Sequence, residues 1–349
     1  MARTEPGRHW QQSTDTWEFA YRFPWGIHPF IRNRQFHFNP GFLLDLWIHP
    51  PGWLLVSGSW YFPTAFLAGW LARRRGVKTL FWNESNLVYV EHASPAADRW
   101  RGRILGCFDG YVVPGAWASE YILHYFPAAK NKPFLQLPNV VDEKIFRQKT
   151  SELRLQRELL LQKWQIPEHA SPLFLCIARL DPIKGIEQLI QSFLSSQVLG
   201  QAILVIAGEG SLKDTLKVLI AHSAGGERVR LLGYVAEADI VELLAIADAF
   251  VLPSLGDPYP LAVIEAAFAG LPLLLSNKVG CHPEALVPEE NGFLFDPYQP
   301  DEIRIFLEKF VGLGKEDWEN MGRKSAFIAE DKFETTKVIH RFVQDIQEL

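Results

Sequence analysis

The sequence predicts a two-domain α/β protein whose second domain is a doubly wound parallel sheet, and three observations support this prediction. The chain has 349 residues, which exceeds one ordinary hydrophobic core and suits two domains. Short apolar runs without polar alternation recur along it, which is typical of strands buried in a parallel sheet. Helical stretches separate these runs, so strands and helices alternate as parallel sheets require.

The second half of the chain carries the clearest alternation. Its helix over Pro260–Ala269 is apolar on nearly every face, which predicts deep burial. The predicted strands are Leu173–Ala178, Ala202–Ala207, Val229–Leu232, Ala249–Pro253, Leu271–Ser276 and Gly292–Phe295. The other predicted helices are Gly185–Ser195, Ser211–His222 and Ala238–Ile246.

The first half is less regular, and residues 1–45 receive no assignment. Leu46–Ala72 contains no Asp, Glu, Lys or Arg, but prolines and glycines interrupt it. We therefore expect a buried strand and a short helix there, and no transmembrane span. The predicted strands are Trp53–Ser57, Lys78–Trp82, Gly110–Pro114 and Leu135–Pro138, and the predicted helices are Thr64–Arg75 and Trp117–Tyr125.

These patterns predict four segments. Residues 1–145 form an N-terminal domain, 146–171 a linker with a charged helix over Ser151–Trp164, and 172–320 the C-terminal domain. Residues 321–349 form a C-terminal helix that we expect to pack back on the N-terminal domain. Ile303–Phe310 and Thr335–Gln347 are the helices expected near this end.

Composition indicates a folded protein in a reducing compartment. Hydrophobic residues make up 48% and charged residues 21% of the chain, which argues against disorder. The cysteines Cys107, Cys176 and Cys281 form no CxxC pair, so we interpret them as core residues rather than a disulfide framework. The polar, charged N-terminus does not resemble a secretory signal, which indicates a cytoplasmic protein.

Charge is unevenly divided between the two halves. Residues 1–149 carry 17 Lys and Arg against 11 Asp and Glu, a balance of +6, whereas the remainder carries 18 against 29, a balance of −11. A basic first half favours peripheral contact with the inner face of the cell membrane or with a lipid phosphate. Chance distribution of solvated charge explains it about equally well. Arg73–Arg75 fit the end of a helix electrostatically and also suit phospholipid headgroups.

Loops after successive predicted strands carry the chemistry, because ligands bind at the carboxyl ends of parallel strands. Arg179 and Lys184 follow the first strand beside a helix start and suit a pyrophosphate, although basic loop residues are usually only solvated. Gly208 and Gly210 would let the backbone approach a ligand, with a plain loop as the alternative. The backbone near Val235 could pair with a base edge.

The segment after the fourth strand is the strongest element. It contains Asp257-Pro258-Tyr259-Pro260-Leu261 and then Glu265 among Ala, Val and Ile. A carboxylate in an apolar helix is costly unless it binds something. Ribose hydroxyls would satisfy Glu265, and a structural carboxylate paired to a neighbour is the alternative.

The run from Ala178 to Pro297 resembles the retaining glycosyltransferases of family 4, which have the GT-B fold of two Rossmann-like domains facing a cleft. Six features occur in the family's order, which makes chance agreement implausible. They are Arg179, Lys184-Gly185, Gly208-Glu209-Gly210, Asp257 to Leu261 with Glu265-Ala266, Gly280 to Glu284, and Asn291-Gly292 with Asp296-Pro297.

The resemblance implies roles for these residues. Arg179 and Lys184 would bind the donor diphosphate, Glu265 the ribose hydroxyls, and the Leu261 and Ala262 N–H groups a phosphate. The backbone near Val235 would read the base, and Gly208 and Gly210 would line the nucleotide. Asp257 replaces the family's first Glu at the transferred sugar. Tyr259-Pro260 replaces Phe-Gly, and Tyr259 is a further candidate for binding the nucleotide-sugar. Pro260 is expected in the first helical turn, where a missing donor costs little.

The N-terminal resemblance is partial. Lys78–Ser85 resembles the strand that usually ends in a catalytic-cleft His, so Glu84 is a cleft candidate, with a simple loop carboxylate as the alternative. The chain starts at Arg3–Trp10, which resembles the stretch after the family's second strand. We therefore expect a shortened N-terminal domain, which puts acceptor binding in doubt.

The resemblance implies a retaining, metal-independent hexosyltransferase in polysaccharide biosynthesis. It would use a UDP-sugar such as UDP-glucose and a glycan or lipid-linked glycan acceptor, with no cofactor and no nucleic-acid partner. The chain contains no Asp-x-Asp sequence, and a leaving phosphate oxygen would deprotonate the acceptor. A nicotinamide-dependent dehydrogenase would require a GxGxxG motif after a strand, which the sequence lacks. A PLP-dependent phosphorylase would require a much longer chain. A non-catalytic nucleotide-sugar-binding relative stays open.

Overall fold

The computed structural model describes residues 20, 22–31, 34–35, 37–58, 62–88 and 94–349. The chain divides into two compact units, one of Met1–Trp82 with Ser94–Tyr111 and the other of Asn83–Ala93 with Val112–Leu349. The stretch Arg3–Trp10, which suggested a shortened domain, lies outside the described residues. Mixed α/β structure with parallel sheets confirms the fold class expected from the sequence.

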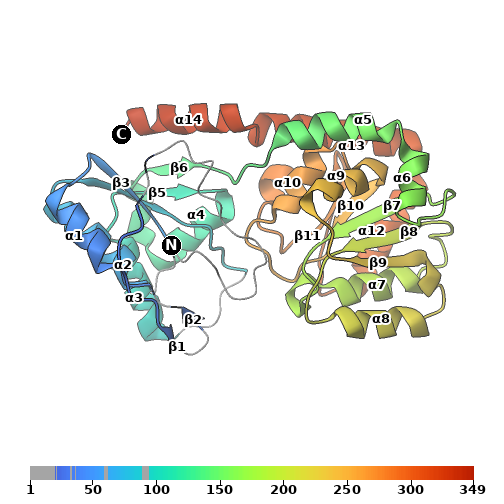
Figure 1. Ribbon diagram of the computed structural model, residues 1–349, viewed down its shortest axis with the longest axis horizontal. Coiled ribbons are helices and arrows are strands. Elements are labelled where there is room, and N and C mark those ends of the chain that lie inside the picture. The colour runs from blue at the N-terminus through green and yellow to red at the C-terminus, as the bar shows by residue number, and fades with distance from the viewer. Residues whose placement is uncertain (1–19, 21, 32–33, 36, 59–61, 89–93) are drawn as a thin grey trace. The chain divides into compact units, whose positions relative to one another are not determined.

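A six-stranded parallel sheet organises the second unit (Figure 1). Its strands lie in the order β12-β11-β10-β7-β8-β9, so the chain starts near the middle and moves to one edge before crossing to the other. The strands are β7 (Leu173–Ile177), β8 (Ile203–Ala207), β9 (Val229–Gly233), β10 (Ala249–Leu252), β11 (Leu273–Ser276) and β12 (Gly292–Phe295). All six predicted strands are therefore present, with shifts of one or two residues at their ends.

Helices connect the strands and cover both faces of this sheet (Figure 1). They are α7 (Ile186–Ser195), α8 (Lys213–His222), α9 (Glu237–Ile246), α10 (Leu261–Phe268), the short α11 (His282–Ala285) and α12 (Pro300–Leu313). Helix α10 is as deeply buried as its composition predicts, since Val263, Ile264, Ala266, Ala267 and Phe268 are all buried.

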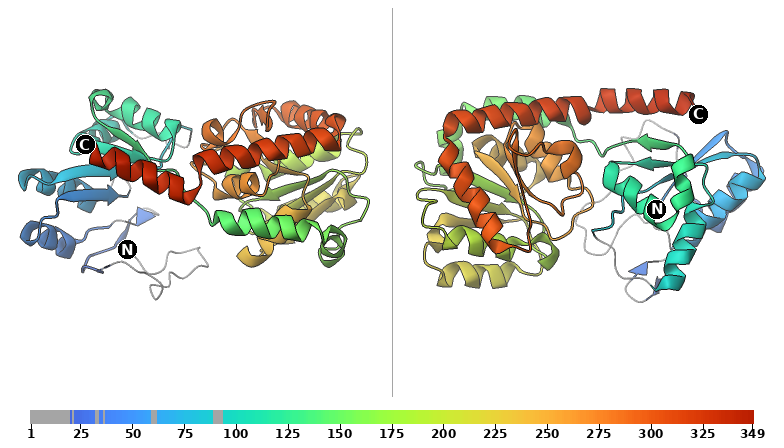
Figure 2. Two further views of the ribbon diagram at one scale, coloured as in Figure 1. Left: turned by 90° about the horizontal axis from the view of Figure 1, so that it is seen from above. Right: turned by 180° about the vertical axis from the view of Figure 1, so that it is seen from behind.

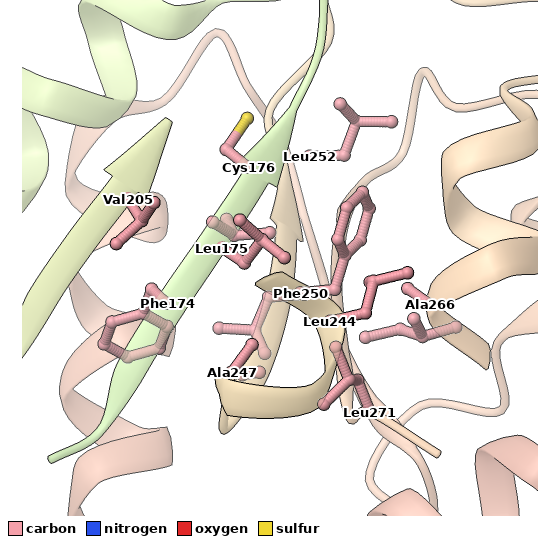
Figure 3. Packing of buried hydrophobic residues seen from close by; sticks show 14 of the residues in the cluster. Phe174, Leu175, Cys176, Val205, Leu244, Ala247, Phe250, Leu252, Ala266 and Leu271 are labelled. Carbon is pink, nitrogen blue, oxygen red and sulfur yellow. The ribbon is translucent and has the colours of Figure 1, made fainter. Parts of the chain in front are cut away.

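The core lies where the strands meet these helices. Figure 3 shows Phe174 and Leu175 of β7 beside Val205 of β8 and Phe250 of β10, all of them fully buried. Cys176 and Cys281 are also fully buried and free, which agrees with their interpretation as core residues, but Cys107 is only partly buried, so the same prediction was wrong for it. Apolar area removed from water on this scale is the main force that holds the sheet and its helices together.

A second sheet has four strands in the order β3-β4-β5-β6. They are β3 (Trp53–Ser57), β4 (Lys78–Trp82), β5 (Gly110–Val113) and β6 (Phe134–Gln136). The helices of this region are α1 (Pro40–Ile48), α2 (Pro63–Arg74), α3 (Pro95–Leu105) and α4 (Ala116–Tyr125), and β1 (Phe30–Ile31) pairs with β2 (Arg34–Gln35).

Strand β3 departs from the prediction of a buried strand. Trp53 is 38% and Leu55 42% exposed, and only Val56 is buried. The prediction was wrong because the side chains of Trp53, Leu55 and Ser57 share one face of this edge strand, and that face is exposed. An apolar run alone does not distinguish an edge strand from a central one.

The linker and the C-terminal region also differ from the prediction. The expected helix over Ser151–Trp164 is broken into α5 (Thr150–Arg154) and α6 (Arg157–Lys163), preceded by a π-helical turn at Ile145–Lys149. Residues 321–349 were expected to form one C-terminal helix, but α13 (Lys315–Lys332) ends before Phe333 and a separate helix follows it. The beginning of α13 at Lys315 was not predicted.

Helix α14 (Thr335–Gln347) was predicted with the same bounds, and it follows α13 at the end of the chain (Figure 2). Its Thr335 hydroxyl donates to Glu143 Oε2 at 2.8 Å, and the helix contacts β6. No helix among the described residues is both long enough and apolar enough to cross a membrane.

Candidate functional site

Five loops meet at the end of the six-stranded sheet where its strands terminate. They follow β7, β8, β9, β10 and β11, and they contain every residue that the sequence assigned to a nucleotide except those on α10. The carboxyl ends of parallel strands lie along one edge, so residues from 178 to 284 converge there. The fold therefore supplies a common location for motifs that are far apart in sequence.

Lys184 and Asp257 form the centre of this site. The Lys184 ammonium is ion-paired with Asp257 Oδ2, and both side chains are largely buried. The Asp257 backbone is held in place as well, because its N–H donates to Lys278 O at 3.1 Å and its carbonyl accepts from Gly280 N–H at 2.8 Å. A buried cation therefore faces a carboxylate at the position where the resemblance puts the donor.

Glycines in these loops are required by contacts within the chain. A Cβ at Gly208 would lie 1.8 Å from Ala178 O, and one at Gly210 would lie 2.6 Å from the Leu180 backbone. Gly185 has φ +67°, and its Cβ would lie 2.2 Å from Pro253 O. Because these glycines have no side chain, the loops can pack against one another. Binding of a nucleotide by Gly208 and Gly210 stays a prediction.

Arg179 does not join the central pair. Its side chain is 73% exposed, and its Nη1 lies 2.8 Å from Asp181 Oδ2. An exposed guanidinium on the rim of a site is free to move onto an incoming phosphate, at the cost of a weak surface ion pair. Its predicted contact with a diphosphate therefore depends on a change of partner.

Glu265 lies on α10 and is partly buried. Burial raises the pKa of its carboxyl from 4.5 to about 7, and the charge of Glu237 adds to the shift. A carboxylate kept near neutrality in this way is poised to lose its proton when hydroxyl donors approach it. No hydrogen bond to this side chain occurs among the described residues.

The first turn of α10 offers N–H groups to the same region. Leu261 and Ala262 are its first two residues, and the first N–H groups of a helix have no intrahelical acceptor. The helix begins at Leu261, so Pro260 is the residue before it rather than part of its first turn as expected. The missing N–H of Pro260 costs little at either position.

Tyr259 is buried, and its hydroxyl donates to Pro114 O at 3.4 Å. Burial raises the pKa of this hydroxyl well above its ordinary value, so it stays protonated. Glu84 also contributes to that pKa shift, which puts its exposed carboxylate near Tyr259.

The loop after β9 carries the predicted base-reading backbone. Tyr234 is 71% exposed, and its N–H donates to Glu209 Oε1 at 3.2 Å. Glu209 is also ion-paired with Lys213, which lowers the pKa of its carboxyl. Val235 is partly buried beside these residues, and its role with a base stays a prediction.

The loop after β11 holds residues that the sequence reading named only as a motif. Glu284 Oε1 accepts from Ala116 N–H at 2.8 Å, at the start of α4, and the His282 ring packs edge-on against Trp117. Burial lowers the pKa of His282 to about 4, so its ring is neutral at pH 7. The family motif over Gly280 to Glu284 was the signal available for both residues.

Buried oxygen atoms without partners collect at this end of the sheet. Ser254 Oγ, Asn277 Oδ1 and Glu284 Oε2 are buried and have no hydrogen-bond partner among the described residues. Buried polar atoms are normally satisfied, so a bound molecule or water is expected to complete them. The described part of the chain contains no group of His, Cys, Asp or Glu able to hold a metal ion.

Comparison with known proteins agrees with this geometry. Residues 157–325 match the family described as Glycosyl transferases group 1. This match covers α6 to α13 in part, which includes the six-stranded sheet and its loops.

Two curated relatives illustrate the match. An uncharacterized glycosyltransferase of Methanocaldococcus jannaschii is 32% identical over 172 residues, which are 45% of this chain and 44% of the relative. The Escherichia coli UDP-Gal:alpha-D-GlcNAc-diphosphoundecaprenol alpha-1,3-galactosyltransferase is 32% identical over 180 residues, 50% of this chain and 43% of that protein. The chain thus aligns with less than half the length of these relatives.

Solved structures share the fold. Anabaena Alr3699/HepE in complex with UDP matches with a TM-score of 0.73 at 17% identity, over 88% of this chain and 81% of that one. A glycosyltransferase from Rickettsia africae matches with a TM-score of 0.72 at 15% identity, over 88% and 79%. The architecture is therefore that of the GT-B glycosyltransferases.

Proposed function

We propose that this protein, whose residues 157–325 are a glycosyl transferases group 1 domain, transfers a hexose from a nucleotide-diphospho-sugar to a glycan or lipid-linked glycan acceptor. The observation that carries the proposal is the convergence of Lys184, Asp257 and the α10 N-terminus at one end of the six-stranded sheet. A glycosyl donor leaves behind a nucleoside diphosphate. A buried ammonium and helix N–H groups can stabilise its developing charge without a metal ion.

Each residue has a proposed part in this reaction. Lys184 leaves part of its pairing with Asp257 to bind the diphosphate, and Arg179 exchanges Asp181 for a phosphate oxygen. Asp257 then accepts hydrogen bonds from hydroxyls of the transferred sugar. Glu265 loses its proton and accepts hydrogen bonds from the two ribose hydroxyls. Because the pKa of its carboxyl is near 7, this loss of the proton is possible at neutral pH.

The proposed stereochemical course is retention. No protein nucleophile is assigned; a phosphate oxygen of the leaving group takes the proton from the acceptor hydroxyl on the same face of the sugar. UDP-glucose is the first donor to test, because Anabaena Alr3699/HepE is crystallised with UDP-glucose. A lipid-linked acceptor is suggested by the Escherichia coli galactosyltransferase, whose substrate carries diphosphoundecaprenol. We further propose peripheral contact with the cytoplasmic membrane face.

Donor turnover tests the proposal. Purified protein is incubated with UDP-, GDP- and ADP-glucose, and release of free nucleotide and glucose is followed. We expect slow hydrolysis of one donor, with the first-formed glucose in the α configuration by NMR. Loss of this activity in Lys184→Ala, with Lys217→Ala unchanged, would assign it to this site. Inversion of the anomeric configuration would contradict the proposed course.

A non-catalytic relative that binds a nucleotide-sugar is the second candidate. It is favoured by the tight pairing of Asp257 with Lys184, which occupies the carboxylate expected to contact the sugar. Tight UDP binding without turnover of any of the three donors would support this candidate.

A further inference from the structure

A second concave site lies at the opposite end of the six-stranded sheet. It is a pocket of about 770 Å³ whose floor comes from the residues that precede β7, β10 and β11. Figure 3 shows two of them, Ala247 and Leu271, at the end where the strands begin. Helix α13 and the linker helices α5 and α6 supply its walls. None of the motifs that point to a nucleotide-sugar lies here.

The pocket has an excess of positive charge. Arg147, Arg154, Arg157, Lys315 and Arg323 line it, against the carboxylates of Glu168, Asp248 and Glu319. Arg147 is ion-paired with Glu330, so four cations remain for the three carboxylates of the lining. Four of these five cations belong to residues 150–349, where 18 Lys and Arg face 29 Asp and Glu, a net charge of −11. Positive charge is therefore concentrated at this pocket, although this half of the chain is acidic overall.

One carboxylate serves several of these cations. Asp248 Oδ2 accepts from Leu173 N–H at 2.7 Å and lies 3.5 Å from Arg157 Nη2. Burial raises the pKa of Asp248, whereas Arg157, Lys315 and Arg154 lower it in decreasing order. Three positive groups therefore act on a single carboxylate that already accepts a backbone N–H, and Arg157 is the one within ion-pair distance of it.

The remaining contacts leave donors free. Arg154 Nη2 donates to Ala269 O, and Arg323 Nη2 donates to Asn320 on its own helix. The Lys315 ammonium has no hydrogen bond or ion pair within the described part of the chain. Although Arg154 as a residue is exposed, desolvation lowers the pKa of its guanidinium, so this group lies against protein rather than in open water. Each guanidinium retains N–H groups that can bind a further acceptor.

The floor of the pocket is apolar. Phe268, Leu271 and Trp318 line it and are almost entirely buried beneath it, with Ala245 and Ala247 between them. A cationic rim over an apolar floor suits a molecule with an anionic head and a ring or chain as its body. The planar forks of arginine match the oxygens of a phosphate in pairs, and a phosphate monoester carries up to two charges for several cations.

We propose that this pocket binds a phosphate monoester, with its head among Arg154, Lys315 and Arg323 and its body on the floor of Phe268 and Leu271. The phosphate can belong to a free small molecule or to a lipid headgroup. This site is separate from the nucleotide site and does not depend on the proposed glycosyl transfer.

Phenyl phosphate is the probe, because it joins a phosphate to a flat apolar body. Its binding is measured by calorimetry in the presence of saturating UDP, which occupies the other end of the sheet. We expect it to bind more tightly than inorganic phosphate. Arg154→Gln with Arg323→Gln should weaken binding at least about tenfold, because each substitution removes a charge-assisted hydrogen bond to the phosphate. Arg230→Gln with Arg341→Gln removes the same charge elsewhere and should change it less than about twofold.

Further arms distinguish the sources. Flotation with phosphatidic-acid vesicles tests a lipid headgroup; vesicle binding that the Arg154 and Arg323 changes abolish, without phenyl phosphate binding, assigns the phosphate to lipid. If the double variant does not fold, Lys315→Gln alone should weaken binding of the same probe. Absence of binding to both probes would overturn the proposal. Equal binding by the double variant, or binding of hexaglutamate without either phosphate probe, would overturn it as well.

Discussion

The two ends of the six-stranded sheet hold their charges in different ways. Where the strands terminate, Lys184 is paired with one carboxylate and Glu265 lies on an apolar helix with a raised pKa. Where the strands begin, Arg154, Arg157 and Lys315 gather around Asp248 over an apolar floor. At the first end, a ligand must displace Asp257 from Lys184 before it can bind the ammonium. At the second end, the cations outnumber the carboxylates, so an anion can bind without breaking a pair.

This contrast shows why only one end is visible in the sequence. The end of the sheet where the strands terminate, called here the terminating end, is built from short motifs that follow strands at fixed spacing. Examples are Arg179 with Lys184 and Asp257 with Glu265. The starting end draws single residues from positions 147 to 323, with no spacing in common. A site of the second kind is recognisable only after the chain is folded.

Both ends depend on one core, so removing its centre should have the largest effect. Phe250→Ala is expected to lower the free energy of unfolding by about 3–5 kcal/mol, because the buried ring leaves a cavity. Urea denaturation measures this loss, and Val218→Ala on the exposed face of α8 should cost less than about 0.5 kcal/mol. A loss below about 1 kcal/mol for Phe250→Ala would contradict the packing.

A change confined to the terminating end should have a smaller effect on stability. A Cβ at Gly280 would lie 1.9 Å from Pro258 O and 2.7 Å from Asn86 Nδ2, so Gly280→Ala should cost about 1–3 kcal/mol. Gly312→Ala is the matched control, because it lies in α12 with nothing within 4 Å and should stabilise by about 0.5–1 kcal/mol. Thermal unfolding of the two variants should therefore shift in opposite directions.

Lys184→Ala separates the two ends by their ligands. It should weaken UDP binding by about 2 kcal/mol, roughly thirtyfold, because a charge-assisted hydrogen bond to phosphate is lost. Phenyl phosphate binding at the starting end should be unchanged in the same calorimetric assay. Equal weakening of both ligands would mean that the two ends are not independent.

The raised pKa of Glu265 predicts a pH dependence of stability. Its folded pKa of about 7 lies above its ordinary value of 4.5, so the folded chain holds the proton more tightly. This contribution to stability should therefore be full below about pH 4.5 and should fall by about 3 kcal/mol as the pH rises through 7. Glu265→Gln should remove this part of the dependence, which parallel urea denaturation of both proteins at pH 5 and 8 would measure.

Much of the fold follows from local patterns in the sequence. Most strands of the larger sheet were predictable because strands buried on both faces are largely apolar, as in Phe174 and Leu175, whereas the edge strand β9 is partly buried and contains Arg230. The bounds of α13 were not, because the expected C-terminal helix over residues 321–349 is in fact two helices that meet near Phe333. Exposure of β3 was missed because its residues are apolar on both faces, although only one of those faces is covered.

The candidate site was predictable in its parts but not in its contacts. Motif order identified Lys184, Asp257 and Glu265, yet the pairing of the first two spans 73 residues and needs the folded sheet. Sequence gave no sign that Gly208 and Gly210 are required by the Ala178–Leu180 backbone. The contact of Glu284 with Ala116 likewise joins two segments 168 residues apart.

Calorimetric titration of UDP into the parent protein and Glu265→Ala at pH 8 tests the central claim most directly. At this pH the Glu265 carboxyl is mostly ionised in the parent, because its pKa is about 7. If Glu265 holds the ribose of a nucleotide at the terminating end of the sheet, the variant should bind UDP at least about tenfold more weakly. Equal affinity in the two proteins would contradict that assignment.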